Sequence, residues 1–179
     1  MSGYRKRYVT RSADETRALG AAIASIAEPA DVLLLEGELG TGKTTFTKGL
    51  VEALDGDVVV TSPTFTLCHR YETTPPVAHV DCFRIGPNDE LTDLALDELV
   101  DEGCVLVIEW GERAEALVGD AIVLTFVAND DRDGETRFIE VDASSPSWSS
   151  RAEVLFERVA AIGIETVKSR SEAPSKAHP

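Results

Sequence analysis

The chain is predicted to fold as an α/β sandwich of three layers around a mixed central sheet. Two runs of four aliphatic residues, at 32–35 and 105–108, show no polar alternation, which is typical of strands covered on both faces. Segments with apolar residues at helical spacing lie between the expected strands. Several strands in the middle and at the end follow one another through short turns, so the sheet is expected to be mixed rather than purely parallel.

The first helix is expected over residues 13–27. Ser12 followed by Glu15 matches a capping box, in which a hydroxyl and a carboxylate each satisfy a free backbone N–H at a helix start. Leu19 and Ile23 then fall on one helical face, so the helix should bury one side against the sheet.

The middle of the chain is expected to alternate short elements. After the strand at 32–35 comes a glycine-rich turn and a helix that buries Phe46, Leu50 and Leu54. The elements expected next are a short strand at 58–60, a loop at 61–65, strands at 66–71 and 77–83, a helix at about 91–100, the strand at 105–108, and a closing hairpin of 121–127 with 137–141.

The composition changes after residue 142, and this change predicts the domain organisation. Residues 1–142 are expected to form one domain, and residues 143–179 a C-terminal extension. Serines crowd around Pro146, and apolar residues at helical spacing then predict one helix over about 147–163. The last ten residues are polar with two prolines, so we expect a disordered tail after the helix.

The chain is acidic, with 17 basic and 32 acidic residues among 179 and a net charge of −15. The first 142 residues hold 12 basic and 28 acidic side chains, so they carry −16. A domain with this negative charge repels a phosphate backbone, which argues against a protein that binds nucleic acid by itself. A well-solvated surface explains the charge equally simply. Three cysteines without a CxxC pair, no apolar leader and no long apolar run favour a cytoplasmic protein without a membrane segment.

Residues 37–44 (GELGTGKT) match the phosphate-binding loop pattern GxxxxGK[ST]. Glycines let the backbone N–H groups turn inward toward a β-phosphate, and the following helix offers its positive end. Lys43 would reach the β and γ oxygens, and the Thr44 hydroxyl would bind Mg²⁺. A glycine-rich turn without a ligand is the alternative, but the strand before the loop and the helix after it favour a nucleotide such as ATP or ADP with Mg²⁺.

A nucleotide with Mg²⁺ also needs a carboxylate at the end of a neighbouring strand. Glu109 directly follows the aliphatic run 105–108, and Asp81 ends the run that begins at Val77. Carboxyl ends of strands in open α/β sheets are where ligands bind. Each acid alone is explained by a solvated strand end. With the phosphate loop present, function is favoured for Glu109, and both interpretations stay open for Asp81.

Four segments together resemble the TsaE (YjeE) family: GELGTGKTTF at 37–46, TSPTF at 61–65, HVDCFR at 79–84 and EW at 109–110. Their order and spacing agree with that family over residues 8–142. The phosphate loop alone occurs in many ATPases, whereas TSPTF followed by HVDCFR is specific.

The resemblance implies a P-loop NTPase-like fold and the ATPase subunit of bacterial N6-threonylcarbamoyladenosine synthesis at tRNA adenosine 37. It implies TsaB and TsaD as partners, through which tRNA is met only indirectly. By the same resemblance Thr44 and Glu109 bind Mg²⁺, and Asp81 assists hydrolysis. The residues implied to hold the phosphates are Gly40, Thr41, Gly42, Lys43, Thr44 and Thr45.

The chain departs from the family pattern in two places. Residues 143–179 lie outside the resemblance. Gly111 stands where family members commonly have proline, which is expected to loosen the loop after Trp110. Neither difference touches the expected phosphate or metal ligands.

The expected reaction is in-line attack of water on the γ-phosphate. Lys43, the loop amides and Mg²⁺ would spread the developing charge, while Asp81 or Glu109 orients the water. No arginine-finger pattern stands out, so hydrolysis by the isolated chain should be slow and should rise when a partner completes the site. Arg84 could serve as a finger, although an ion pair with Asp89 or Glu90 is the simpler interpretation.

Two further positions are candidates for contact with the nucleotide. The loop 61–64 lies where a hydroxyl could sense the γ-phosphate, although a turn at the start of a strand explains Pro63 equally well. Arg137, on the last strand, could contact the nucleotide, and pairing with a neighbouring acid is its alternative.

Two other function classes share part of this pattern. A P-loop small-molecule kinase would share Lys43, Thr44 and an acid, but it needs clustered arginines over the phosphates, which residues 53–127 do not contain. A GTP-dependent switch needs an NKxD-like guanine reader, and the segment NDDR at 129–132 lacks its lysine. The kinase therefore stays as the alternative function.

Overall fold

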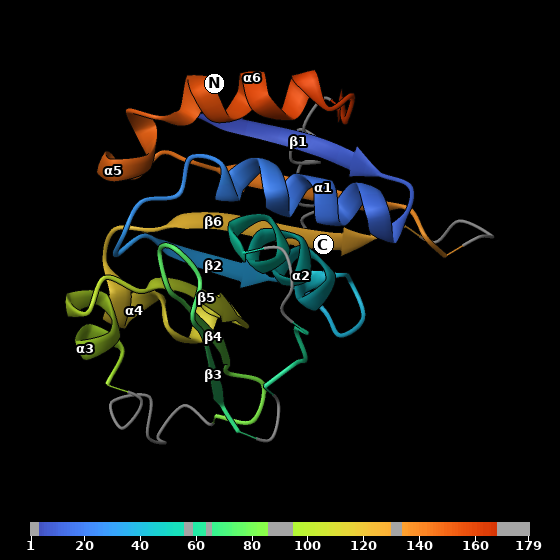
Figure 1. The fold of residues 1–179 in the computed structure, drawn as a ribbon. Coiled ribbons are helices and arrows are strands. Elements are labelled where there is room, and N and C mark those ends of the chain that lie inside the picture. The colour runs from blue at the N-terminus through green and yellow to red at the C-terminus, as the bar shows by residue number, and fades with distance from the viewer. Residues whose placement is uncertain (1–3, 56–58, 64–65, 86–94, 130–133, 168–179) are drawn as a thin grey trace, which may run out of the picture.

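A computed structural model describes residues 4–55, 59–63, 66–85, 95–129 and 134–167. They form an eight-stranded sheet in the order β3-β4-β5-β2-β6-β7-β1-β8 (Figure 1). β4, β5, β2 and β6 are parallel neighbours, whereas the other neighbours pair antiparallel, so the mixed sheet is confirmed. The strands are β1 Arg5–Thr10, β2 Val32–Glu36, β3 Cys68–Tyr71, β4 Val77–Asp81, β5 Val105–Glu109, β6 Ile122–Ala128, β7 Arg137–Asp142 and β8 Glu165–Val167.

Helices cover both faces of this sheet and complete the expected three layers. The long helices α1, α2 and α6 pack against one face, while the short elements α3, η2 and α4 cover the β4-β5-β2 half of the other (Figure 1). The helices are α1 Ala13–Ala24, α2 Lys43–Asp55, α3 Leu96–Asp101, η2 Gly111–Arg113, α4 Glu115–Val118, α5 Pro146–Ser149 and α6 Ala152–Ala161.

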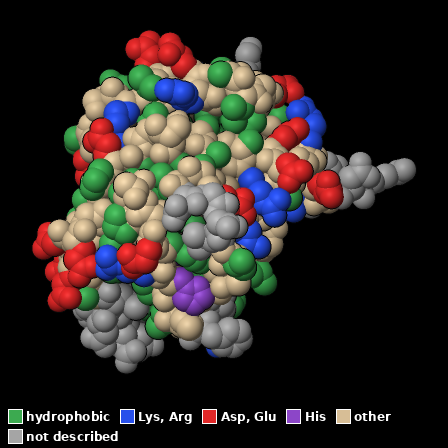
Figure 2. Space-filling view, in the orientation of Figure 1, with side chains coloured by type: hydrophobic (Ala, Val, Ile, Leu, Met, Phe, Trp, Pro, Cys, Tyr) green, Lys and Arg blue, Asp and Glu red, His purple; other side chains and the backbone are tan. Residues whose placement is uncertain are grey.

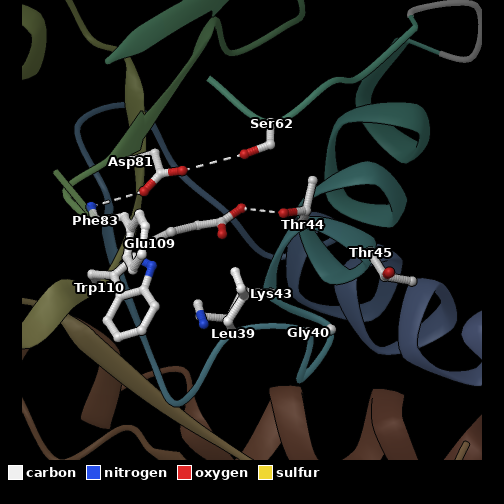
Figure 3. Close-up of a pocket in the computed structure, with 11 residues that line it drawn as sticks. Leu39, Gly40, Lys43, Thr44, Thr45, Ser62, Asp81, Phe83, Glu109 and Trp110 are labelled. Atoms are coloured by element: carbon white, nitrogen blue, oxygen red, sulfur yellow. Dashed lines mark hydrogen bonds between the residues drawn. The ribbon is translucent and has the colours of Figure 1, made fainter. Parts of the chain in front are cut away.

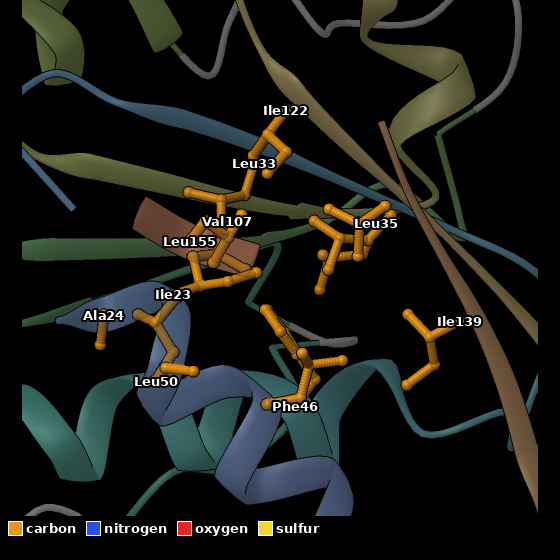
Figure 4. Packing of buried hydrophobic residues seen from close by; sticks show 14 of the residues in the cluster. Ile23, Ala24, Leu33, Leu35, Phe46, Leu50, Val107, Ile122, Ile139 and Leu155 are labelled. Atoms are coloured by element: carbon orange, nitrogen blue, oxygen red, sulfur yellow. The ribbon is translucent and has the colours of Figure 1, made fainter. Parts of the chain in front are cut away.

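The core consists of two apolar clusters, one on each face of the sheet. Along β2, Leu33 and Leu35 enter the larger cluster, whereas Val32 and Leu34 enter the smaller one. Figure 4 shows the larger cluster, in which residues of α1, α2 and α6 meet the sheet. The unbroken aliphatic run of β2 is thus explained by burial on both faces, as the sequence predicts.

The N-terminal helix is capped as expected at its first turn, with one difference. Ser12 Oγ accepts a hydrogen bond from the Glu15 backbone N–H at 3.1 Å. The Glu15 carboxylate accepts from the backbone N–H of Arg11 at 2.8 Å, one residue before the position that a capping box uses. The helix ends at Ala24, three residues earlier than predicted.

The predicted short strand at 58–60 is wrong for its described residues. Val59 and Val60 belong to no strand, and only Val60 is buried. Residue 58 and residues 64–65 of the expected loop lie outside the described residues. β-branched side chains favour strands only where a neighbouring strand can pair with them, and no described strand pairs with residues 59–60.

Two other predicted strands are shorter than expected. β3 begins at Cys68, because the backbone N–H groups of Thr66 and Leu67 both donate to the Pro63 carbonyl and form a turn. β4 ends at Asp81, because the chain then turns so that Ile85 N–H donates to the Cys82 carbonyl. The helix expected at 91–100 is α3, which begins at Leu96, and residues 91–94 are outside the described part.

The closing hairpin is confirmed, and the C-terminal extension differs from its prediction. β6 and β7 pair antiparallel with Leu124 opposite Val141. The single helix predicted over 147–163 is instead two helices, α5 and α6. Residues 165–167 form β8, which pairs antiparallel with β1. Residues 168–179 lie outside the described residues.

The extension is part of the main core. Trp148, Leu155, Phe156 and Val159 are all buried in the larger cluster beside residues of α1 and β1. Burying a large apolar side chain contributes about 2 kcal/mol, so these four contacts matter for the stability of the whole sandwich.

On the face shown in Figure 2, acidic side chains are spread over the surface, at several separate places around the outline, rather than gathered in one patch. The three cysteines are all free. Among the described residues, none of the helices combines the length and apolarity needed to cross a membrane.

Candidate nucleotide site

A pocket of about 530 Å³ opens at the carboxyl ends of β2, β4 and β5, the edge where open α/β sheets bind ligands (Figure 3). The phosphate loop forms one wall, and the ends of β4 and β5 form the opposite wall. Its lining residues are Leu39, Gly40, Gly42, Lys43, Thr44, Thr45, Ser62, Asp81, Phe83, Glu109 and Trp110.

The phosphate loop connects β2 to α2 and has the backbone that its glycines predict. Gly37, Gly40 and Gly42 have φ values of 125°, 76° and 107°, a region that side chains beyond glycine rarely adopt. Thr41 Oγ1 donates to the Glu38 carbonyl at 2.8 Å and closes the loop on itself. α2 begins at Lys43, so the positive end of a helix of 13 residues faces the pocket.

Lys43 is the buried cation of the pocket. Its Nζ donates to the carbonyls of Gly37 at 2.6 Å and Glu38 at 2.8 Å, and it lies 4.5 Å from the centroid of the Trp110 ring. Burial lowers the pKa of Lys43, while the nearby carboxylates, Glu109 foremost, act in the opposite direction. The ammonium group is therefore desolvated beside the loop, which strengthens its attraction for an anionic ligand.

Glu109 receives two hydrogen bonds on one oxygen. Thr44 Oγ1 donates to Glu109 Oε1 at 2.7 Å, and His79 Nε2 lies 2.9 Å from the same oxygen. The parallel register of β4 and β5 sets Asp81 beside Glu109, so the two predicted acids lie at the same edge. The structure thus brings together Lys43, Thr44, Asp81 and Glu109, as the sequence analysis expected.

Asp81 is held by the segments on either side of it. Its Oδ1 accepts from the Phe83 backbone N–H at 2.9 Å, and its Oδ2 accepts from Ser62 Oγ at 3.2 Å (Figure 3). Ser62 belongs to the loop expected to sense a γ-phosphate, and this contact brings that loop to the pocket. Its neighbour Thr64 lies outside the described residues.

Three of the lining residues, Leu39, Phe83 and Trp110, are large and apolar, and together they are called the apolar rim of the pocket. Leu39 is 77% exposed and Phe83 is 40% exposed, and the rings of Phe83 and Trp110 have centroids 5.1 Å apart. Exposed apolar groups gathered at one site mark contact surfaces more often than isolated ones do.

The loop after Trp110 is tightly packed, which corrects the expectation that Gly111 loosens it. A Cβ on Gly111 would lie 2.6 Å from Leu34 Cβ and 2.9 Å from Leu34 Cα. Trp110 itself has a φ of 61°, an uncommon value for a non-glycine residue. Gly111 therefore lets the chain after Glu109 press directly onto β2.

Arg137 lies on the far side of the phosphate loop, at a second hollow of about 210 Å³. Its Nη1 donates to the carbonyls of Gly134 at 2.6 Å and Thr136 at 2.9 Å, and its Nη2 is 3.4 Å from the Gly40 carbonyl. The hollow is lined by Ser12, Ala13, Thr16, Gly40, Gly42, Thr45, Glu135 and Arg137. Arg137 is thus near the loop but apart from Asp81 and Glu109.

Arg84, the candidate arginine finger, is exposed and lines neither hollow. Asp89 and Glu90, its expected partners, lie outside the described residues. Among the residues that line the larger hollow, Lys43 is the one basic side chain.

Sequence reasoning assigned no role to Arg113 or His79. Arg113 Nη1 donates to the carbonyls of Cys82, Phe83 and Ile85 at 2.7 to 2.8 Å, so it fixes the turn after Asp81. These contacts join residues about thirty positions apart, and local sequence patterns carry no signal for them. His79 was noticed as part of a motif, but its contact depends on strand register.

The oxygen groups at the pocket fit a magnesium ion. Among the described residues no group of three or more His, Cys, Asp or Glu side chains could hold a metal. Mg²⁺ bound with a nucleotide needs only one or two protein oxygens because phosphates and water complete its shell. A hydroxyl that donates its proton to a carboxylate keeps its lone pairs, so Thr44 beside Glu109 matches that requirement.

Comparison with known proteins places these features in a family. The family model described as threonylcarbamoyl adenosine biosynthesis protein TsaE matches residues 10–138. The tRNA threonylcarbamoyladenosine biosynthesis protein TsaE of Streptomyces coelicolor is 39% identical over 140 residues, covering 75% of this chain and 94% of that protein. The protein of the same name from Bacillus subtilis is 43% identical over 110 residues, covering 61% of this chain and 68% of that protein.

A solved structure agrees with this result. The crystal structure of Bacillus subtilis YdiB is similar with a TM-score of 0.70 at 30% identity, covering 88% of this chain and 95% of that chain. The family match spans the whole phosphate loop, both strand-end carboxylates and most of the sheet. This chain therefore belongs to the TsaE family.

Proposed function

We propose that this chain binds ATP with Mg²⁺ and hydrolyses it as the nucleotide-dependent subunit in threonylcarbamoyl modification of tRNA adenosine 37. The observation that carries the proposal is that a buried ammonium group, a glycine-rich loop at a helix start and a hydroxyl–carboxylate pair all line one pocket. The names of the Streptomyces and Bacillus relatives support the biosynthetic role.

The phosphates would lie against the loop. Backbone N–H groups from Gly40 to Thr45 would donate to their oxygens, and Lys43 would exchange its two carbonyl contacts for the β and γ oxygens. The desolvation of Lys43 supports this exchange, because a buried cation gains most from an ionic partner.

Thr44 and Glu109 are the residues that would hold Mg²⁺. A bound ion would supply positive charge that stabilises the negative charge developing on the phosphates. Glu109 is already oriented by two donors, so little ordering of its side chain remains to be done on binding.

Asp81 would orient the attacking water. It lies beside Glu109 in the strand register but accepts its bonds from Ser62 and Phe83 rather than from Thr44. With Glu109 assigned to the ion, Asp81 is the lining carboxylate left to accept a proton from water near the γ-phosphate.

The nucleoside would occupy the second hollow. That hollow shares Gly40, Gly42 and Thr45 with the larger pocket, so a nucleotide whose phosphates follow the loop can reach both. Arg137 is the cation on this side of the loop, and its guanidinium is positioned by the carbonyls of Gly134 and Thr136.

The partner subunits, expected to be TsaB and TsaD, would dock on the apolar rim of Leu39, Phe83 and Trp110. In the proposed placement of the phosphates the rim would lie next to the γ-phosphate, and Lys43 is the only basic side chain among the lining residues. A partner that covers the rim would exclude water from the site and could add the missing positive charge.

The test is release of phosphate from γ-labelled ATP with Mg²⁺, measured for the chain alone and with TsaB, TsaD and tRNA. We expect slow turnover by the chain alone and a rise of about 10³- to 10⁵-fold with the partners, which is the range that a supplied arginine gives. A Lys43→Ala chain, mixed with the same partners, should release no phosphate above background.

Two results would contradict the proposal. Turnover of several per second by the isolated chain would contradict the dependence on partners. Label transferred to a metabolite rather than released as phosphate would instead support a small-molecule kinase, the alternative function.

A further inference from the structure

His79 is a buried polar group of the site with no role in the function proposed above. Its side chain on β4 is fully buried, and its Nε2 lies 2.9 Å from Glu109 Oε1 on β5. Its other ring nitrogen, Nδ1, has no hydrogen-bond partner among the described residues. Because buried polar atoms are rarely left unpaired, this arrangement needs a reason.

The surroundings of the ring select one tautomer. A carboxylate oxygen only accepts, so Nε2 must carry the proton in order to donate to Glu109. The opposite tautomer would set a lone pair against the carboxylate and would bury the Nδ1 proton with no acceptor. An unpaired lone pair is tolerated better than an unpaired N–H, so the chain leaves the acceptor, rather than the donor, unsatisfied.

The strand register makes this contact rigid. Val107 is the residue opposite His79 in the parallel pair, and Glu109 lies two residues further along β5 on the same face. β4 is buried along its whole length, so neither backbone has room to shift. The ring can therefore act as a fixed donor for a glutamate whose side chain would otherwise have several rotamers.

We propose that His79 is a positioning residue that fixes Glu109 for the metal ion. Glu109 Oε1 is held by His79 and Thr44, and its second oxygen makes no hydrogen bond among the described residues, so that oxygen is left for the ion and its waters. This inference rests on the proposed function, in which Thr44 and Glu109 hold Mg²⁺. A residue behind a metal ligand typically changes metal affinity by about 10- to 100-fold when it is removed.

The tautomer can be measured without metal, nucleotide or turnover. The chain has three histidines, His69, His79 and His178, so ¹⁵N–¹H correlation spectra of its imidazoles are simple to assign by substitution. We expect the His79 signals of the metal-free protein to show a proton on Nε2. A proton on Nδ1 with none on Nε2 would overturn the proposal.

Two amide variants separate the hydrogen bond from the shape of the ring. In His79→Gln the side-chain N–H₂ can reach the place of Nε2, whereas in His79→Asn it reaches only the place of Nδ1. Binding of a fluorescent N-methylanthraniloyl analogue of ADP is measured across a Mg²⁺ titration and again in EDTA. We expect His79→Asn to need about 10- to 100-fold more Mg²⁺, His79→Gln to follow the unchanged chain, and all three to agree in EDTA.

The outcomes separate this inference from the function on which it rests. If Mg²⁺ leaves nucleotide binding by the unchanged chain unaltered, the proposed metal site is wrong. If the unchanged chain responds to Mg²⁺ and His79→Asn responds identically, His79 does not position Glu109. Equal losses in both variants would show that only the ring shape matters, which also overturns the inference. Should either variant fail to fold, the imidazole spectra of the unchanged chain decide.

Discussion

Two cations that are largely shielded from water, the buried Lys43 of the candidate nucleotide pocket and the partly buried Arg151 of the C-terminal extension, are stabilised in opposite ways. Arg151 makes hydrogen bonds to both carboxylate oxygens of Asp31, at 2.7 and 2.8 Å, and to the Ile26 carbonyl at 2.9 Å. Its guanidinium also lies 4.4 Å from the centroid of the Trp148 ring. Lys43 directly contacts two carbonyl oxygens and the Trp110 ring, and no ion pair with it occurs among the described residues.

This difference separates a structural charge from a functional one. A buried charge that is paired with a carboxylate and hydrogen-bonded on several sides holds the chain together, and nothing remains for a ligand. A buried charge that meets only dipoles costs folding free energy, and an anionic ligand offsets that cost on binding. Arg151 therefore fastens the extension to the loop before β2, whereas Lys43 is left able to pair with an anionic ligand, which in the proposed function is the phosphate of the nucleotide.

The largest effect is expected from removing the extension. A chain that ends at Ala143 loses at least four large buried side chains, Trp148, Leu155, Phe156 and Val159. At about 2 kcal/mol each, the loss of roughly 8 kcal/mol would consume most of an ordinary folding free energy. Denaturant unfolding followed by circular dichroism measures it. A shortened chain as stable as the full one would restore the boundary at 142/143 as a true domain limit.

Arg151→Ala should come next. Asp31 would be left buried without its partner, which costs about 3 kcal/mol of unfolding free energy. Nucleotide affinity should stay unchanged, because Arg151 lines neither hollow. Arg158→Ala, on the exposed side of α6, is the matched control and should change stability by less than about 0.5 kcal/mol. If both substitutions lower the unfolding free energy equally, the ion pair of Arg151 with Asp31 does not stabilise the fold.

Gly111→Ala tests the pocket side of the comparison. The new Cβ would lie 2.6 Å from Leu34 Cβ, so the chain after Glu109 must shift, at about 2 kcal/mol of stability. Because Trp110 and Glu109 directly precede this position, nucleotide affinity should fall as well. Thermal unfolding and nucleotide titration are measured on the same sample. Lowered stability with full affinity would mean that the loop packs independently of the site.

The smallest effect is expected at Asp142, beside the start of the extension. Burial raises the pKa of Asp142, but hydrogen bonds from Ser144 and Arg5 outweigh it, so the pKa lies below the ordinary value. The Asp142 carboxyl group therefore binds a proton more readily in the unfolded chain than in the folded one. Its ionised form stabilises the fold above about pH 4, and this stabilisation is lost as the pH falls through the lowered pKa. Asp142→Asn should flatten this acid dependence by about 1 kcal/mol or less, since Arg5 is exposed. An acid unfolding curve identical to that of the unchanged chain would assign the dependence to other groups.

Features that depend on residues close together in the sequence could be predicted, whereas contacts between distant positions could not. The strand–loop–helix of the phosphate loop and the acid at the end of β5 were predictable, because hydrophobic runs and glycine spacing are local signals. The fold class followed from the same signals. The strand expected at 58–60 failed because β-branched residues favour a strand only where the tertiary structure supplies a neighbour.

Contacts between distant segments were out of reach of that reasoning. Arg151 meets Asp31 across 120 positions, and β8 pairs with β1 from the opposite end of the chain. His79 was visible as a motif residue, but its contact with Glu109 depends on the register of two parallel strands. Sequence patterns thus identified the residues of the site better than the interactions that orient them.

Calorimetric titration of the unchanged chain and of Lys43→Ala with ATP and Mg²⁺ tests the central claim most directly. We expect one nucleotide per unchanged chain, and an affinity weaker by on the order of 1000-fold for Lys43→Ala, because a desolvated charge pair with the phosphates is lost. The variant should remain folded and at least as stable without ligand, since an unpaired buried charge has been removed. Absence of heat with the unchanged chain, or equal affinities for both chains, would contradict the claim that Lys43 is buried in order to bind phosphate.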